Sequence, residues 1–539
     1  MKPWMWKTAS IVFAVYIFGL VAVYIFVAGR SVDFSYTVAG QDEVVVGEPA
    51  ALRVGVYDIF RGQFVPTSQV DVTLVRGDER AELYTGRTTA TGFADVNLQV
   101  PAVEPGEASW HITFHPPELE PKSIEVPVRL IAPSAHDPKG PFAEAAMEVR
   151  PAEAASKPGV PPREGTGPVL LDLVAEGGAA ADGLRSLYFV QATDRATGKP
   201  VAAEVKLELV KGMLDGEPPN RVKTHAGGLG YLAMVPIGSQ KWKLTTETKA
   251  EDGQVLTSER ELVVESRAKQ FAMVLNRPIW TGDHNLELGV RTLHRSGVLW
   301  ADVYSDGRWQ SGEAAGIGTE GGGFSLRRPT SLESGDLRLM RVQVYGAALA
   351  PGEAADVRVV VAPPPTMEAR AVLERLLRLA VDAGVRPKAA QGVLDAGWVA
   401  TGSDKDVEAA ISFWLSLLPV SVEQPALLFD SQKMDRGKLK DDKNDLKEPV
   451  SWLLGLSGAL ALLIVFYVVM VNVLKVRRES EAMVAELGDL EGDDADDEGT
   501  RKGLAASNLG RFDAVFQIII VMGTLFLFFV AIVLLVRHI

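Results

Sequence analysis

Val70-Asp-Val-Thr-Leu-Val-Arg-Gly77 recurs in the chain as Val205-Lys-Leu-Glu-Leu-Val-Lys-Gly212, at an offset of 135 positions. In both stretches an apolar side chain occupies every second position, which is the period of a β-strand with one buried face. Continued without a gap, the same offset aligns Thr89 with Thr224. A single register maintained over this distance predicts a duplicated β-rich module.

The sequence on either side of the first stretch has the same alternating character. Short strands separated by Gly, Pro and Asp fill residues 31–131, and in each strand the apolar side chains share one face. Examples are Leu52-Val54-Val56, Val96-Leu98-Val100 and Trp110-Ile112-Phe114. This spacing predicts an antiparallel sandwich over 31–131 and its repeat over 169–267.

The turns between these strands resemble those of known extracellular modules. Thr197-Gly-Lys-Pro-Val201, followed by the T-x-x-G pattern of the repeat, is similar to the turns of macroglobulin-type and carboxypeptidase-regulatory-like β-sandwich modules. The resemblance implies a sandwich fold and a tendency to bind proteins. It does not imply covalent protease trapping, because the Cys-Gln thioester used for that chemistry needs a Cys and the chain has none.

The rest of the large central segment divides by composition. A third β-rich unit is expected at 270–362, and apolar residues at helical spacing predict a small helical unit at 366–430. Ser403, with Asp406 three positions later, resembles a capping box at the start of one of these helices. Two connecting segments complete the division: a Pro/Ala-rich linker at 132–168 and a charged juxtamembrane linker at 431–449.

Three uncharged apolar runs predict transmembrane helices. They cover 10–28, 450–474 and 514–536, and each is long enough to cross a bilayer core of about 30 Å. A cleaved signal peptide remains an alternative for the first run, with the small residues Val27-Ala28-Gly29 as its cleavage site. The fold class predicted from the whole chain is therefore mainly β, as tandem Ig-like or macroglobulin-like sandwiches, with a small helical unit and three transmembrane α-helices.

Lys and Arg residues near the runs predict the orientation in the membrane. Lys2, Lys7 and the basic residues after the second run indicate a cytoplasmic tail at 1–9 and an acidic cytoplasmic loop at 475–513. The large segment would then lie in the periplasm of a cell with an inner membrane. The lysines between 433 and 447 argue for the opposite orientation, but they end a long domain, and such domains translocate largely regardless of charge.

Composition excludes several classes of protein. The chain has 539 residues, with 55 Lys and Arg against 69 Asp and Glu, which gives a net charge of −14. A nucleic-acid binder would need a concentrated basic face, so no nucleic-acid partner is expected. The absence of Cys excludes disulfides, thiolate metal sites and a Cys nucleophile. No catalytic, cofactor-binding or metal-ligating residue is assigned, and no cofactor is expected.

Two groups of residues are candidates for interaction. The first could form a stacking platform for a sugar or a peptide, with packing in the core as the alternative; it comprises Trp280, Trp300 and Trp309. The second forms a stripe of small residues in the second apolar run and would let a helix approach closely; it comprises Ser451, Gly455 and Ala459. That helix could belong to this chain or to a membrane partner. His111 and His115 share the outward face of one strand and would need a third ligand to bind a metal.

Together these features predict a non-enzymatic, membrane-anchored extracytoplasmic scaffold or subunit of a cell-envelope complex. Its β-sandwich modules would bind protein partners in the membrane or envelope. A transmembrane receptor or regulator that signals through the acidic cytoplasmic loop is the alternative. An envelope enzyme or a glycan-binding protein is a further alternative.

Overall fold

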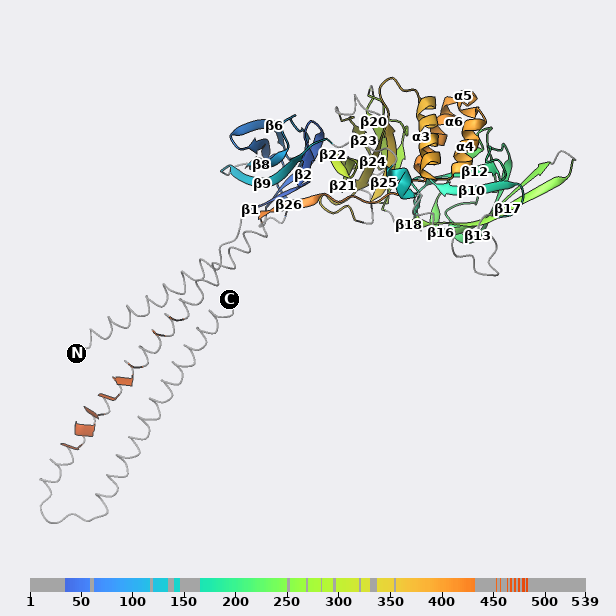
Figure 1. The fold of residues 1–539 in the computed structure, drawn as a ribbon. Coiled ribbons are helices and arrows are strands. Elements are labelled where there is room, and N and C mark those ends of the chain that lie inside the picture. Colours follow the sequence, from blue (N-terminus) through green and yellow to red (C-terminus); the bar gives the residue numbers. More distant parts are fainter. Residues whose placement is uncertain are drawn as a thin grey trace, which may run out of the picture. The chain divides into compact units, whose positions relative to one another are not determined.

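The computed structural model describes residues 34–431, except for short gaps, together with scattered positions between 452 and 482. The gaps are 59–62, 117–119, 134–139, 146–164, 250–252, 268–269, 283, 294–296, 319–320, 330–336 and 353–354. The chain divides into two compact units, of which one is Phe34–Asp430 and the other comprises Met1–Asp33 and Ser431–Ile539. The first unit is mainly β, with few helices, which confirms the predicted class of this part of the fold (Figure 1).

The predicted membrane spans lie almost entirely outside the described residues. This applies to all of 10–28 and 514–536, and to most of 450–474. Among the residues that the structure describes, no helix is long and apolar enough to cross a membrane. The described positions of the second run are helical, and their large side chains are exposed: Trp452, Leu456, Leu463, Phe466, Tyr467, Met470, Val471 and Leu474.

The first sandwich packs two sheets around one apolar core. One sheet contains β1 (Phe34–Gly40), β3 (Pro49–Asp58), β4 (Gln63–Phe64) and β7 (Phe93–Gln99). The other has the order β2 (Glu43–Val45), β9 (Lys122–Ile131), β8 (Gly106–His115), β5 (Gln69–Arg76) and β6 (Glu79–Arg87). Trp110, Ile112 and Phe114 all point into the core, as their alternation predicted.

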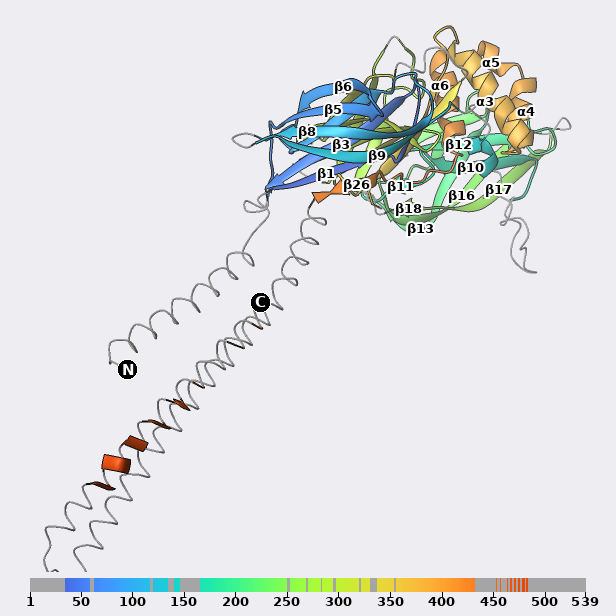
Figure 2. The same ribbon diagram turned by 60° about the vertical axis from the view of Figure 1, so that its left-hand side comes forward.

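The last strand of this sheet comes from the other end of the unit. β26 (Ala426–Asp430) pairs antiparallel with β1, so that Thr37 lies opposite Asp430. Figures 1 and 2 show the two strands side by side. Residues 426–430 were expected to belong to the helical unit, and that expectation is wrong for this segment. A strand of five residues whose partner lies nearly 400 positions away has no local sequence signal.

The second sandwich repeats this arrangement. One sheet contains β10 (Val169–Ala175), β12 (Ser186–Asp194) and β15 (Leu229–Met234). The opposite sheet contains β14 (Arg221–Lys223), β13 (Glu204–Leu214), β16 (Pro236–Lys249) and β17 (Val255–Val264). A short parallel pair, β11 (Ala180–Ala181) with β18 (Ser266–Arg267), lies beside them. Trp242 and Tyr188 are fully buried between the sheets.

The turn shared by the two sandwiches is displaced by one residue from the expected alignment. Thr88 Oγ1 donates to the carbonyl oxygen of Val65 at 2.9 Å, and Thr224 Oγ1 donates to that of Val201 at 2.8 Å. Thr88 is therefore the counterpart of Thr224, and the alignment of Thr224 with Thr89 is wrong. β5 and β13 keep the original offset, so the second module has one extra residue between the strand and the turn. Such a connection tolerates insertions.

A third sandwich follows directly. Its smaller sheet has the order β19 (Phe271–Leu275), β20 (Leu286–Thr292) and β23 (Gly322–Leu326). Its larger sheet has the order β22 (Arg308–Ile317), β21 (Gly297–Ser305), β24 (Arg338–Tyr345) and β25 (Asp356–Ala362). The core between them includes Met273, Leu288, Val303, Val342 and Val360.

The helical unit packs on the second and third sandwiches. It consists of α3 (Ala369–Ala383), α4 (Pro387–Asp395), α5 (Trp398–Thr401) and α6 (Asp404–Leu415). Its core is shared with Phe189 of β12 and with Leu339 and Val361 of the third sandwich. Ser403 caps α6, because its Oγ accepts the backbone N–H of Asp406 at 3.2 Å, which confirms the predicted cap.

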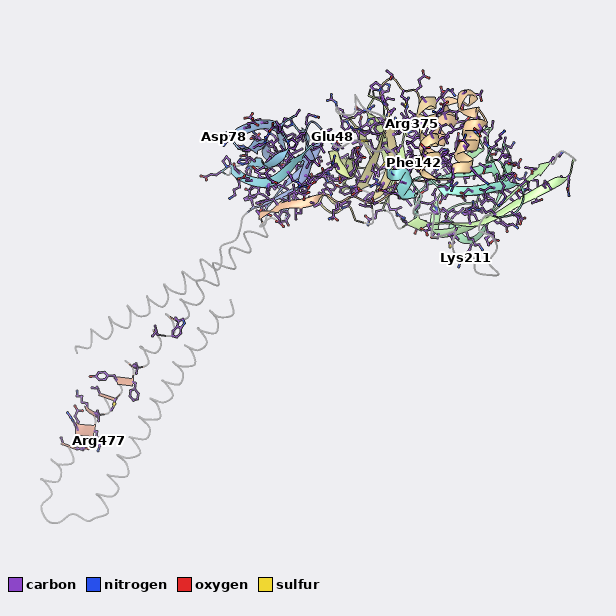
Figure 3. All side chains as sticks on the ribbon, in the orientation of Figure 1. Glu48, Asp78, Phe142, Lys211, Arg375 and Arg477 are labelled. Atoms are coloured by element: carbon purple, nitrogen blue, oxygen red, sulfur yellow. The ribbon has the colours of Figure 1, made fainter. Side chains whose placement is uncertain are left out.

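Part of the segment expected to be an extended linker also joins this core. Residues 140–145 are helical, and Phe142 (Figure 3) is fully buried against the helical unit. The linker interpretation of 132–168 is therefore wrong for this stretch, and residues 146–164 lie outside the described part. A buried aromatic ring supplies a large apolar contact area, and Ala145 joins the same core.

Candidate functional site

The three tryptophans proposed as a stacking platform are buried. Trp280, Trp300 and Trp309 are 1%, 7% and 0% exposed, so none presents a ring face to solvent. Trp280 packs in the core of the third sandwich, whereas Trp300 and Trp309 lie where this sandwich contacts the first. The stripe Ser451, Gly455 and Ala459 lies outside the described residues.

The contact between the first and third sandwiches is centred on Arg53 of β3. This side chain is completely buried, and its Nε lies 2.5 Å from Asp95 Oδ1 of the first sandwich. Its Nη2 donates to Asp302 Oδ1 of the third sandwich at 2.9 Å, and its Nη1 donates to the carbonyl oxygen of Ala348 at 2.8 Å. The hydroxyl of Tyr345 bonds to both Arg53 and Asp302. One guanidinium thus joins groups from two sandwiches.

Aromatic rings surround this cation. The Arg53 guanidinium carbon lies 5.1 Å from the ring centroid of Trp309, 5.8 Å from that of Tyr345 and 5.9 Å from that of Trp300. These distances are in the range of cation–π attraction. The rings also exclude water, which strengthens the ionic hydrogen bonds inside. Two of the candidate tryptophans therefore hold two modules of the same chain together.

Backbone contacts extend the junction beyond the charges. Asn97 Nδ2 of β7 donates to the carbonyl oxygen of Gly312 at 3.0 Å, and the Gly312 N–H donates to Asn97 Oδ1 at 2.9 Å. This reciprocal pair fixes β22 against the sheet of the first sandwich, with the rings of Phe93 and Trp300 edge to face nearby. Burial raises the pKa of the Asp302 carboxyl, and Arg53 partly opposes this effect.

No local sequence pattern indicates this junction. Arg53 occupies the polar position between Leu52 and Val54, and that pattern is typical of a strand with a solvent-exposed outer face. In the structure both faces of β3 are buried. A charged residue at such a position predicts exposure, and only the tertiary contact shows that the residue is paired and covered.

A second set of contacts fixes the helical unit to the second sandwich. Arg386, which precedes α4, pairs with Asp172 of β10 and donates from Nη1 to Gln191 Oε1 of β12 at 2.9 Å. His225 stacks on Trp398 with ring centroids 4.9 Å apart. Both contacts join groups from distant parts of the sequence. The helices are thus held to the sandwich by charge and by ring packing.

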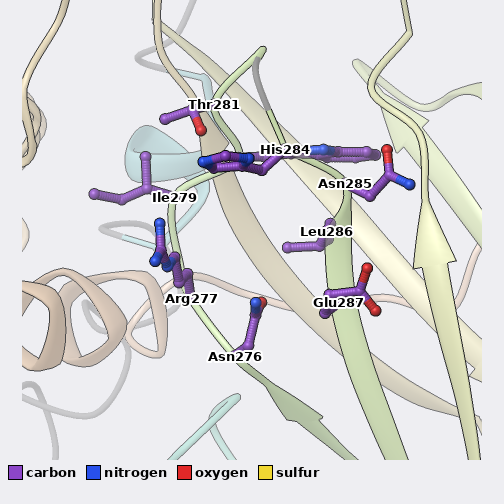
Figure 4. A pocket seen from close by; sticks show the side chains of 9 residues that line it. Asn276, Arg277, Ile279, Thr281, His284, Asn285, Leu286 and Glu287 are labelled. Atoms are coloured by element: carbon purple, nitrogen blue, oxygen red, sulfur yellow. The ribbon is translucent and has the colours of Figure 1, made fainter.

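The third sandwich carries an open pocket at the ends of β19 and β20 (Figure 4). Its volume is about 560 Å³, and its residues are Asn276, Arg277, Ile279, Trp280, Thr281, His284, Asn285, Leu286 and Glu287. In Figure 4 the His284 side chain lies across the pocket between Thr281 and Leu286. The exposed lining is mainly polar and contains a guanidinium, an imidazole, a carboxylate and two amides. Such groups suit hydrogen bonding to a polar ligand.

The candidate histidines face carboxylates on neighbouring strands. His115 Nε2 lies 2.8 Å from Asp71 Oδ2, and His111 Nε2 lies 3.5 Å from Glu125 Oε1. Both rings are partly exposed, on the outer face of β8. No group of three or more His, Cys, Asp or Glu that could hold a metal occurs among the described residues.

Comparisons with known proteins find distant structural similarity alone. No family model and no curated protein matches the chain. The chain is similar to an alpha-2-macroglobulin from Salmonella (12% identity, TM-score 0.15, 61% of this chain and 23% of that one). It is also similar to the dimeric latent PorU from Porphyromonas gingivalis, with 12% identity and a TM-score of 0.20 over 62% of this chain and 34% of that one. The similarity to invasin, a bacterial integrin-binding protein, has 13% identity and a TM-score of 0.15 over 61% of this chain and 60% of that one. Similarities at these TM-scores support nothing about activity or partners.

Proposed function

We propose that this chain is a non-enzymatic, membrane-anchored scaffold or subunit of a cell-envelope complex, and that its β-sandwich unit binds partner proteins outside the cytoplasm. The observation that carries the proposal is the buried junction around Arg53. A paired charge enclosed between two sandwiches fixes their relative orientation, because moving them apart would leave ions unpaired in an apolar environment. Surfaces on different modules therefore keep a constant spacing, which a scaffold needs.

The membrane anchor is proposed from the sequence. The three apolar runs have the length and composition of transmembrane helices. The pairing of β1 with β26 supports an anchored unit, since the first two runs are then joined to adjacent strands of one sheet. A single module would thus carry both connections.

Assembly can be tested on the full chain extracted from its native cells in a mild detergent. A scaffold should migrate in native electrophoresis as a complex larger than the monomer, with defined partner proteins after cross-linking. A preparation that contains monomer alone would contradict the proposal. Arg53→Met should weaken the complex, whereas the matched surface variant Arg129→Met, which removes an exposed pair with Glu43, should leave it intact.

The orientation needs a separate experiment. A biotin ligase can be fused after Ile539, or inserted within the acidic segment 489–498, in intact cells. If the large unit is extracytoplasmic, the inserted ligase should label cytoplasmic proteins and the C-terminal fusion should not. The reverse pattern would place the large unit in the cytoplasm and overturn the envelope assignment.

A further inference from the structure

A row of three paired positions crosses the outer face of the small sheet in the third sandwich, and two of the three are glycine. Val274 of β19 lies opposite Gly289 of β20, and Gly289 lies opposite Gly323 of β23. All three residues are exposed. The row crosses the whole sheet, so the strand backbone lies open at Gly289 and Gly323.

Nothing within the described part of the unit requires glycine at these two positions. Neither Gly289 nor Gly323 has a positive φ, so the backbone conformation would accept any residue. A Cβ on Gly289 would meet its nearest neighbour, the Val274 oxygen, at 3.9 Å, and one on Gly323 would lie 3.4 Å from the Leu288 oxygen. Both are ordinary contact distances. Glycine weakens a strand and often marks a bulge, a bend or a place where another chain approaches the backbone closely. The pairing of β20 with β19 and β23 has no register shift, so a bulge is not the reason here.

This row forms the floor of an open cavity next to the pocket of Figure 4. The cavity over the row has a volume of about 500 Å³ and shares Asn276 and Glu287 with the neighbouring pocket. We call the two together the trench. One wall is ordered by hydrogen bonds: Asn285 Nδ2 donates to Ser325 Oγ at 3.0 Å, and Ser325 donates to Glu287.

Three polar side chains of the trench have no partner among the described residues. Asn276, Arg277 and His284 are exposed, and no side-chain hydrogen bond or ion pair joins them to any described residue. The Glu287 carboxylate, in contrast, already accepts from Ser325. The Ser325 hydroxyl is neutral, so the trench holds one cation, Arg277, and one anion, Glu287. The Arg277 guanidinium, which has no ion pair with a described residue, matches a carboxylate of an occupant. The Asn276 amide matches a peptide group, since it offers one donor side and one acceptor.

We infer that the trench binds an extended peptide segment of a partner protein, which places an acidic side chain at Arg277. The inference rests on the proposed function and names the kind of partner. Bare backbone at Gly289 and Gly323 lets an extended chain lie close to the sheet there, and the amides and the guanidinium on the walls can bond to its peptide groups and to an acidic side chain. A glycan fits less well, because the aromatic lining residues, Trp280 and Phe324, are 1% and 3% exposed and offer no ring to a sugar.

The test is selection of random decapeptides displayed on phage against the purified full chain in detergent. The enriched peptides should share an acidic residue at one fixed position. A fluorescent copy of the most enriched peptide should lose about tenfold or more in affinity for Gly289→Val and for Gly323→Val, because the added side chains fill the trench. Arg277→Glu should weaken binding by charge repulsion.

Gly316→Val is the matched control. Gly316 is also an exposed strand glycine of the third sandwich, without a positive φ and with no atom within 4 Å of an added Cβ, but it does not line the trench. Peptide affinity should be unchanged in this variant. The inference is overturned if no peptide is enriched, if the trench variants bind as tightly as the wild type, or if a glycan array shows binding that Gly323→Val removes. The native complex distinguishes the two proposals. If it persists in both trench variants, the scaffold proposal is retained and the trench is not the site that holds the complex together.

Discussion

Arg53 and Asp302 form an ion pair across two sandwiches, with Nη2 and Oδ1 2.9 Å apart and neither side chain exposed to solvent. The two residues are separated by 249 positions, and the second sandwich lies between them in the sequence. The first and third modules are thus in contact although they are not consecutive. This relationship makes the unit one body rather than a chain of modules, and it gives the first prediction.

Arg53→Met should destabilise the unit by about 3–5 kcal/mol, because it leaves the Asp302 carboxylate buried without its cation. Unfolding of the full chain in detergent, followed by tryptophan fluorescence in increasing denaturant, measures the loss. The double variant Arg53→Met, Asp302→Leu should recover part of it, since the fully buried one of the two carboxylates that lose Arg53 is then removed, while Asp95 remains. A double variant as unstable as the sum of the two single variants would show that the pair is not coupled.

The β1–β26 pairing can be tested by a disulfide, since the chain has no cysteine of its own. Thr37→Cys with Asp430→Cys should form a cross-link, because these residues lie opposite each other. The link should stabilise the unit by up to about 5 kcal/mol by restricting the unfolded chain. Non-reducing electrophoresis and thermal unfolding measure both effects. Asp42→Cys with Asp430→Cys is out of register and should not cross-link; equal cross-linking of both pairs would refute the register.

Attachment of the helical unit to the second sandwich should weaken at low pH. Burial alone would raise the pKa of Asp172, but the guanidinium groups of Arg386 and Arg260 outweigh burial and hold this pKa below its usual value. A carboxyl whose pKa is lower in the folded protein than in the unfolded chain stabilises the fold when the pH is above its unfolded-state pKa, near 3.9. This stabilisation disappears as the pH falls through the folded-state pKa. Hydrogen exchange in α4 should therefore accelerate below about pH 4. In Asp172→Asn, the amides of α4 should exchange faster at pH 7, and the acceleration below about pH 4 should be absent. If the pH profile of exchange is unchanged in this variant, the pair of Asp172 with Arg386 is not the cause of the acceleration.

Glycine substitutions should have opposite effects at different sites. Gly289→Ala and Gly323→Ala should each stabilise the unit by about 0.5–1 kcal/mol, because the space is open and the backbone is ordinary. Gly198→Ala should destabilise it by more than about 1 kcal/mol, since Gly198 has a φ of +74° and an added Cβ would collide with the backbone of Lys388 in α4. Thermal unfolding of the three variants measures the differences. Loss of stability at Gly289 would show that glycine is required there for folding.

The sequence predicted the features that local periodicity determines. Alternation placed Trp110, Ile112 and Phe114 in the core, and the Ser403 cap is where the capping pattern indicated. Both depend on residues within a few positions of one another, which is the range over which strand and helix periods act.

The features that the sequence missed depend on distant contacts. Trp300 and Trp309 are covered by another module, and no pattern within their own strands reports which surface covers the outer face. β26 acquires its conformation from β1, and the trench becomes visible only when the register places Gly289 beside Gly323. A glycine inside an alternating strand was the one local signal for the trench.

The pairing of β1 with β26 also sets an order of events during synthesis. β1 ends at Gly40 and β26 begins at Ala426, so the ribosome must add the whole intervening chain before the first sheet can be completed. At about 5–20 residues per second, this wait lasts roughly 20–80 s. Throughout it the edge of β1 is an unpaired template that other nascent strands can join. The first module to emerge is therefore the last to close, and a chaperone that covers a strand edge would have its substrate here.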